Sequence, residues 1–168
     1  QAEVMVQERA GIIDIGGEST RPGAPEVSIE DELNRVIPVI EALSSNIDVP
    51  ISIDTSKPIV MEKAFNAGAS IINDVNALRS EGALKMAASL QADVCLMHMQ
   101  GSPRTMQKNP TYDNVVSDVK AFFEQRIEAC KSAGIKLNAI TLDPGFGFGK
   151  NLGHNIALLK NLSEFHEF

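Results

Sequence analysis

Acidic and amide side chains stand at or near the ends of three apolar segments in this chain. Asp54 ends the segment ISID, Asn73 lies in SIINDV, and Asp143 ends ITLD. A carboxylate accepts two parallel N–H bonds, and an asparagine side chain both donates and accepts. If the three side chains meet in one cavity, they can bind the edge of a heterocycle that presents several N–H donors.

Three uses of this set remain open. Asp54 could cap the helix that follows it, which is the commoner job of a single Asp in that place. The two carboxylates and the amide could bind Mg²⁺, although Mg²⁺ usually relies on one or two carboxylates plus substrate phosphates. The guanidine-like edge of a 2-amino-4-oxo pterin would use all three groups, since it presents several N–H donors.

The segment IIDIGGESTRPG, residues 12–23, predicts a constrained loop after an apolar run. Two glycines let the backbone turn tightly, and Thr20, Arg21 and Pro22 then supply a hydroxyl, a guanidinium and a rigid ring. This composition suits an anionic ligand. From the spacing alone, an anion-binding loop and a turn in which Arg21 only pairs with a nearby carboxylate are equally consistent with this segment.

The segment LDPGFGFGK, residues 142–150, resembles a phosphate cradle but matches neither GxGxxG nor GxxxxGK[ST]. Its glycines more plausibly let the loop carry Phe146 and Phe148 over the site. There one ring could form a wall for an aromatic substrate. A loop phenylalanine taken alone is more often a packing residue.

Residues 94–101, VCLMHMQG, add side chains with less certain roles. Met97 is expected to fill the core, although its thioether would also pack against a pterin face. His98 is interpreted as a strand-end histidine with satisfied hydrogen bonds rather than as a base. Neither Cys95 nor Cys130 has a base partner and no serine stands in a nucleophile elbow, so covalent catalysis is disfavoured and both thiols are expected to be reduced.

The elements that must position these side chains alternate along the chain. Apolar segments rich in β-branched residues alternate with longer amphipathic ones, which is typical of a parallel sheet covered by helices. A barrel gathers all strand ends around one mouth, whereas an open sheet leaves some far from its crevice. Because Asp54, Asn73 with Asp74, His98 and Asp143 all stand at strand ends, we predict an α/β fold of the (β/α)8 TIM-barrel type. The predicted strands are residues 12–16, 51–54, 70–75, 94–99 and 140–143.

Capping residues predict where the helices begin. Ser28 with Asp31 makes a capping-box-like start, and Ser56 is the expected N-cap of the next helix, with Pro58 in its first turn. The longest helix should follow Asn114.

The predicted units are fewer than a barrel needs. A complete barrel has eight strands and typically about 250 residues. This chain has 168 residues, begins in a helix-like segment at residues 2–9 and ends after a helix expected to carry Ile156, Leu159 and Leu162. We therefore expect residues 1–168 to be a single partial barrel domain of about five βα units, strands 2 to 6, lacking the first strand and the last two βα units.

Composition restricts the classes of partner. With 43% apolar and 22% charged residues the chain resembles ordinary globular proteins. The net charge of −7 argues against a nucleic-acid partner, which requires clustered Lys and Arg. No apolar run approaches the roughly 18 residues of a membrane span, and no signal peptide opens the chain, so a cytoplasmic location without membrane contact is expected.

Five strings in order, GGESTRPG, IDTSKP, INDV, MHMQG and LDPGFGFGK, resemble the bacterial dihydropteroate synthases over essentially the whole chain. The resemblance implies a transferase of folate biosynthesis with small-molecule substrates. It would condense (7,8-dihydropterin-6-yl)methyl diphosphate with 4-aminobenzoate to give 7,8-dihydropteroate and diphosphate, and sulfonamides would compete with the aminobenzoate.

The resemblance also implies site residues. Asp54, Asn73 and Asp143 would bind the pterin edge, and Arg21 would join the two aspartates in catalysis. The pterin rings would be lined by Val75, Met97 and Phe148, and the aminobenzoate and diphosphate would contact Thr20, Arg21, Pro22 and Phe148.

Further expectations follow from the family. Mg²⁺ would be the cofactor, with its Asn ligand upstream and no metal ligand in this chain, and the full-length protein would be a homodimer. A later SRK segment and a terminal Arg-x-His are missing, so this chain alone should be inactive or nearly so. The rival hypotheses are a pterin-binding methyltransferase domain that uses methyltetrahydrofolate, and a non-catalytic barrel.

Overall fold

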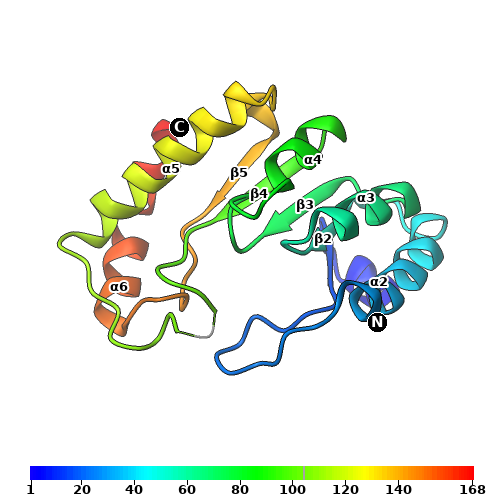
Figure 1. Cartoon of the computed structure of the whole chain (residues 1–168), viewed down its shortest axis with the longest axis horizontal. Coiled ribbons are helices and arrows are strands. Elements are labelled where there is room, and N and C mark those ends of the chain that lie inside the picture. The colour runs from blue at the N-terminus through cyan, green and yellow to red at the C-terminus, as the bar shows by residue number, and fades with distance from the viewer. Residues whose placement is uncertain (104) are drawn as a thin grey trace.

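Five parallel strands form one sheet in the order β1-β2-β3-β4-β5 (Figure 1). The computed structural model describes residues 1–103 and 105–168. Each strand is hydrogen-bonded to the next strand in the sequence, and a helix lies between them along the chain, which is the arrangement of successive βα units. The strands are β1 (Ile13–Gly16), β2 (Ile51–Asp54), β3 (Ile71–Asp74), β4 (Asp93–Met97) and β5 (Ile140–Asp143).

Six α-helices and two 3-10 helices accompany these strands in the described residues. In Figure 1, α2 to α5 lie along one side of the sheet, while the long segments after β1 and β4 approach each other at the opposite end. The helices are α1 (Ala2–Gln7), α2 (Ile29–Ser44), α3 (Pro58–Ala67), α4 (Ala83–Ser89), α5 (Val115–Ser132) and α6 (Leu152–Lys160), and the 3-10 helices are η1 (Leu137–Ala139) and η2 (Leu162–Glu167).

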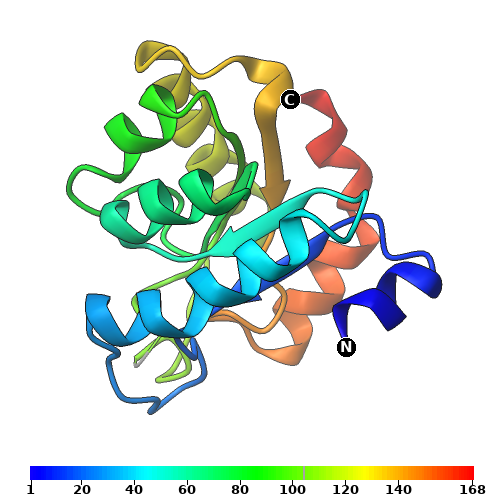
Figure 2. The same ribbon diagram turned by 90° about the vertical axis from the view of Figure 1, so that its right-hand side faces the viewer.

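Alternation within the strands divides the sheet into two faces. Side chains of one parity, such as Ile53, Ile72 and Leu96, are fully buried in a core shared with α2 to α5. The other parity carries most of the polar side chains of the strands. We call this second face the inner face, because it points away from the covering helices (Figure 2). The predicted α/β fold of partial TIM-barrel type is confirmed.

Three predicted strands are longer than the observed ones, the first only by Ile12. The strand predicted to reach residue 75 ends at Asp74, because the Asp74 carboxylate accepts hydrogen bonds from the backbone N–H groups of Asn76 and Leu78, both at 2.8 Å, and so begins a turn. The strand predicted at 94–99 ends at Met97, and its last link to the neighbouring strand is His98 N–H to the Asp143 carbonyl at 2.9 Å.

The helix starts are confirmed at two of three predicted positions. Ser28 Oγ accepts the Asp31 N–H at 3.0 Å, and Asn114 caps α5. Ser56 was predicted to cap α3, which is wrong: its hydroxyl bonds to the buried Asp74 carboxylate, and α3 begins at Pro58 without a side-chain cap. The Ser56 hydroxyl therefore donates to Asp74 and does not cap the helix.

The predicted last helix is divided in two. Leu162 lies in η2 rather than in α6, and Ile156 and Leu159 are exposed. Leu158 is the fully buried residue of α6 and packs beside Phe123 and Phe165. None of the described helices combines the length and apolar character needed to cross a bilayer.

Candidate functional site

Strand register brings the predicted acidic and amide residues onto the inner face. Asp54 is the Cα partner of Asn73, and Asn73 is the partner of Cys95. Two residues further along β4, Met97 is the partner of Asp143. Since side chains two residues apart share a face, Asp54, Asn73 and Asp143 project on the same side of the sheet. Asp74 has the other parity and points toward the helices, so it does not join them.

Asp14 belongs to the same set and was missed by the sequence analysis. Asn73 Nδ2 donates to Asp14 Oδ2 at 3.1 Å. Because a carboxylate without a proton is only an acceptor, the contact turns the amide nitrogen toward Asp14 and leaves Asn73 Oδ1 for other donors. The alternation of side chains in IDIG, the sequence of β1, places Asp14 on this face. Asp14 was missed because the sequence analysis considered only residues at or near strand ends.

The inner face is electrostatically acidic. Burial, followed by the charges of Asp14, Asp74, Glu32 and Glu18 in that order, raises the pKa of the Asp54 carboxyl to about 7. A ligand that donates N–H bonds to Asp54 would favour the ionised form and lower this pKa again.

Cys95 lies among the carboxylates of the inner face. Burial raises the pKa of its thiol to about 12, with contributions from the charges of Asp143, Asp14 and Asp54. A thiol with this pKa stays protonated and is no nucleophile at neutral pH. Cys95 and Cys130 are both free thiols, as predicted.

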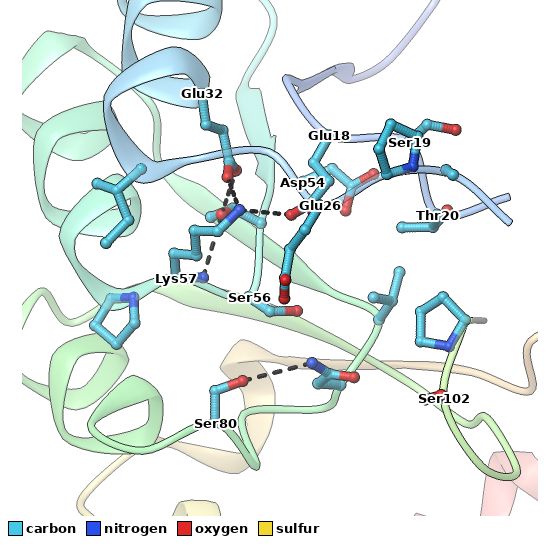
Figure 3. Close-up of a pocket in the computed structure, with 18 of the residues that line it drawn as sticks. Glu18, Ser19, Thr20, Glu26, Glu32, Asp54, Ser56, Lys57, Ser80 and Ser102 are labelled. Atoms are coloured by element: carbon cyan, nitrogen blue, oxygen red, sulfur yellow. Dashed lines mark hydrogen bonds and ion pairs between the residues drawn. The ribbon is translucent and has the colours of Figure 1, made fainter. Parts of the chain in front are cut away.

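A cavity of about 720 Å³ opens beside Asp54 (Figure 3). Its walls come from the segments that follow β1, β2 and β3, together with Ser102 and Pro103. Of the predicted site residues, Thr20, Arg21, Asp54 and Val75 line it. Pro22 is exposed on the same loop but is outside the lining, as are Asn73, Met97, Asp143 and Phe148.

Val75 joins this cavity to a neighbouring apolar cluster. Val75, Met97, Met99 and Met106 are buried together, and Phe148 packs against them. Phe148 is therefore a packing residue of this cluster, and its contact with a substrate stays a prediction. Phe146 is 43% exposed and is not part of the cluster.

A partly buried ionic network anchors the loop after β1. This network was not predicted from the sequence. Lys57 Nζ contacts Glu18 Oε2 at 2.5 Å and also contacts Glu32, as Figure 3 shows. Glu32 is fully buried and accepts the Thr55 hydroxyl at 2.6 Å. Glu18 also accepts the Val27 N–H at 3.0 Å. The loop that carries Thr20 and Arg21 is therefore tied to α2 and to the start of α3.

The balance of effects at Lys57 favours its charged form. Partial burial lowers the pKa of its amine, but the hydrogen bonds and charges of Glu18 and Glu32 outweigh this and raise the pKa above its ordinary value. Glu18 in GGES and Lys57 in TSKP stand on segments singled out from the sequence, yet nothing in their spacing predicts that the two side chains meet.

His98 and Asp143 are held by the glycine-rich loop. His98 is buried and its Nδ1 lies 2.9 Å from Lys150 Nζ, which confirms the interpretation of a satisfied strand-end histidine. Asp143 Oδ1 accepts the Gly145 N–H at 2.8 Å. Burial, followed by the charges of Lys150 and Arg79, lowers the pKa of His98 to about 3, so its ring is neutral.

Within residues 1–103 and 105–168, no three His, Cys, Asp or Glu side chains come together in a way that could hold an ion. The Mg²⁺ cofactor expected from the sequence stays a prediction.

Comparisons with known proteins agree with this geometry. A family model described as pterin binding enzyme matches residues 1–168. The chain is 55% identical to the dihydropteroate synthase of Escherichia coli (strain K12) over 167 residues, which cover 99% of this chain and 59% of that protein.

Two solved structures are close in shape. The Yersinia pestis dihydropteroate synthase with a sulfonamide drug complex gives a TM-score of 0.96 at 55% identity and covers 98% of this chain and 60% of that one. The Xanthomonas albilineans dihydropteroate synthase with 4-aminobenzoic acid gives 0.93 at 48% identity and covers 99% of this chain and 59% of that one.

Proposed function

Because the chain belongs to the pterin binding enzyme family over residues 1–168, we propose that its protein is a dihydropteroate synthase. The protein would join (7,8-dihydropterin-6-yl)methyl diphosphate to 4-aminobenzoate in folate biosynthesis and would bind sulfonamides. The chain spans 59% of the Escherichia coli relative, so the activity is proposed for the whole protein. The shared inner face of Asp54, Asn73 and Asp143 is the observation that carries the proposal.

The pterin would lie against the inner face. Asp54 and Asp143 would accept its exocyclic and ring N–H groups, and Asn73 would offer Oδ1, since its Nδ2 is turned toward Asp14. The acidity of this face suits a ring edge rich in donors and opposes the binding of a diphosphate there. This opposition orients the substrate with its diphosphate toward the cavity.

The remaining predicted residues would bind the other parts of the substrates. Val75, Met97 and Phe148 form the apolar cluster beside the inner face and would flank the pterin rings. Thr20 and Arg21 line the cavity and would contact the diphosphate and the aminobenzoate, with the exposed Pro22 at the rim.

The reaction would proceed by departure of the diphosphate from the pterin methylene. The C–O bond breaks with its electron pair going to the diphosphate, and the amine nitrogen of aminobenzoate then forms the new C–N bond and loses a proton to solvent. Arg21 would stabilise the leaving diphosphate, while Asp54 and Asp143 would hold the pterin so that its cationic centre stays in place.

Mg²⁺ remains part of the proposal as the cofactor. It would neutralise charge on the departing diphosphate. The described residues contain no group of three His, Cys, Asp or Glu side chains that could hold the ion.

Titration calorimetry with the pterin diphosphate tests the proposal on the full-length protein. Asp54→Ala and Asp143→Ala should each remove measurable binding, since a buried hydrogen-bonded charge is lost. Asp93→Ala is the matched control, because Asp93 is exposed at the opposite end of β4 and should leave binding unchanged. Retained affinity in both site variants would refute the assignment.

The rival functions give different results in the same experiments. A methyltransferase domain would bind methyltetrahydrofolate and would not release diphosphate, and a non-catalytic barrel would bind neither. The homodimer and the cytoplasmic location expected from the sequence remain predictions.

A further inference from the structure

We propose that Lys150 is a positioning residue whose ammonium group acts as a built-in cation at the centre of the loop 143–150. In this role it replaces the metal ion that binds oxygen-lined loops in other proteins. Its effect on pterin binding rests on the function proposed above, whereas its effect on the loop does not.

The surroundings of the ammonium group are those of a coordinated cation. Lys150 is 3% exposed. Its Nζ lies 2.9 Å from His98 Nδ1, 3.1 Å from the His98 carbonyl, 3.0 Å from the Gly145 carbonyl and 2.9 Å from the Phe148 carbonyl. All four acceptors are uncharged. A lysine is rarely buried without a carboxylate partner, because removing the charge from water is costly.

This arrangement is maintained against a cost in free energy. Burial lowers the pKa of the Lys150 amine to about 8, although the charge of Asp143 acts in the opposite direction. An ordinary core would place an apolar residue here. The retained charge therefore calls for a role, and the contacts indicate what it holds.

The ammonium connects two backbone positions of the loop to the end of β4. Gly145 and Phe148 belong to the loop, while His98 directly follows Met97. The backbones approach so closely that a Cβ on Gly145, where φ is +67°, would stand 2.1 Å from the His98 carbonyl oxygen. Three carbonyl oxygens that point at one atom repel one another, and a cation between them compensates this repulsion.

Two proposed pterin-binding groups depend on the loop. Asp143 Oδ1 is fixed by the Gly145 N–H at 2.8 Å, and Phe148 packs in the apolar cluster with Val75 and Met97. Other contacts hold the outer part of the loop, such as the Tyr112 hydroxyl on the Gly149 carbonyl at 2.8 Å. Lys150 therefore controls the inner part, where the site residues lie.

Lys150→Met in the full-length protein removes the charge and keeps all but the last atom of the side chain's length. The dissociation constant for the pterin diphosphate should rise at least about tenfold, as expected when a hydrogen bond from the ligand to the Asp143 carboxylate is lost. Lys160→Met is the matched control, because Lys160 is exposed on α6 and should leave this constant unchanged. An unchanged dissociation constant in Lys150→Met would overturn the proposal.

Chemical rescue separates a cation role from simple packing. Lys150→Ala leaves a space lined by the four acceptors, which methylammonium can enter and tetramethylammonium, lacking N–H groups, cannot satisfy. Methylammonium should restore pterin affinity at least about tenfold and with saturation, since it restores hydrogen bonds to a charged group. Equal rescue by both ions, or none, would contradict a specific cation site.

Amide hydrogen exchange at residues 143–150 reports on the loop without any substrate. Exchange should be faster in Lys150→Ala and should slow again with methylammonium. If the wild-type protein bound no pterin but this rescue held, the proposed function would fail and the positioning role would stand. Unchanged exchange in the variant would refute the positioning role alone.

A pair of substitutions at the partner residue covers the case in which Lys150→Ala does not fold. His98→Asn keeps an acceptor near the position of Nδ1, and His98→Leu has none. Near-normal protection of the loop in His98→Asn with loss in His98→Leu supports the proposal. Equal behaviour of the two variants would count against it.

Discussion

A carboxyl group with a pKa near 7 is unusual in a binding site that works at neutral pH. Asp54 owes this value first to burial and then to the acidic residues around it, Asp14 foremost. At neutral pH about half of these groups carry a proton. The free site is therefore partly neutralised, and it becomes fully charged when a donor-rich ligand binds.

Proton release on ligand binding follows from this pKa. Below pH 7 the pterin diphosphate should displace a proton from Asp54, so affinity should rise with pH through about 7. Calorimetry in two buffers with different ionisation enthalpies measures the number of protons released. The release should disappear above about pH 8, where Asp54 is already ionised before binding, and an undiminished release there would assign it to another group.

The same residue should influence stability. Because the folded-state pKa of Asp54 is raised from 3.8 to about 7, the folded protein binds more protons than the unfolded chain between these values. The contribution of Asp54 is present below pH 4 and is lost as pH rises through 7. Asp54→Asn should therefore raise Tm more at pH 8 than at pH 5. Equal changes at both pH values would contradict the raised pKa.

Asp14 controls the orientation of an amide. An asparagine at position 14 could donate as well as accept, so the Asn73 amide would no longer be held with Oδ1 toward the ligand. Asp14→Asn should weaken pterin binding by roughly 1.5–3 kcal/mol, the worth of a hydrogen bond to a charged group. Asp93→Asn is the control, and equal affinities in the two variants would deny the role.

Residue types at strand ends were predictable, but their partners were not. Asp54, Asn73 and Asp143 could be found because each follows an apolar run. Lys150 could not, since a lysine is expected at the surface and only the folded backbone creates its cage of carbonyls. Ser56 was misassigned because a buried acceptor 18 positions away took its hydroxyl.

At the scale of elements, the Glu18–Lys57–Glu32 network joins three segments into one unit. Lys57→Met would leave Glu32 buried without a charged partner. The free energy of unfolding should fall by about 2–4 kcal/mol, at the lower side of the range for buried pairs because Lys57 is partly exposed. Thermal or urea unfolding measures this loss.

A double variant provides the control. Lys57→Met with Glu32→Gln removes both charges and should recover most of the lost stability. A double variant as unstable as the single one would show that the network acts through packing of the lysine stem rather than through charge.

Strands and helices were predicted well where local signals agreed. The bounds of β2 and β5 were predicted without error, since each apolar run ends in a single polar residue. The ends of β3 and β4 were overestimated, because hydrophobicity continues through Val75 and Met99 while the backbone leaves the sheet to form a turn and a loop. Hydrogen bonding, which the pattern does not display, decides these ends.

At the scale of the molecule, one property of parallel sheets makes the site possible. All five strands end at the same edge, so groups from residues 14 to 143 face one space. The sequence predicted this from polar residues at successive strand ends. It did not predict the division into an acidic inner face and a separate cavity after β1 to β3, because that depends on how the loops fold back.

The exposed Pro22 and the hydrogen-bonded residues of the inner face differ in how many contacts a substitution would disturb. Pro22 lies exposed and outside the cavity lining, so its replacement disturbs few neighbours. Replacement of Asn73 or Asp143 also releases Asp14 or the Gly145 backbone. An inhibitor that bound mainly near Pro22 would therefore be evaded by substitutions that cost the fold little, whereas one bound to the inner face would require substitutions that disturb several of these contacts.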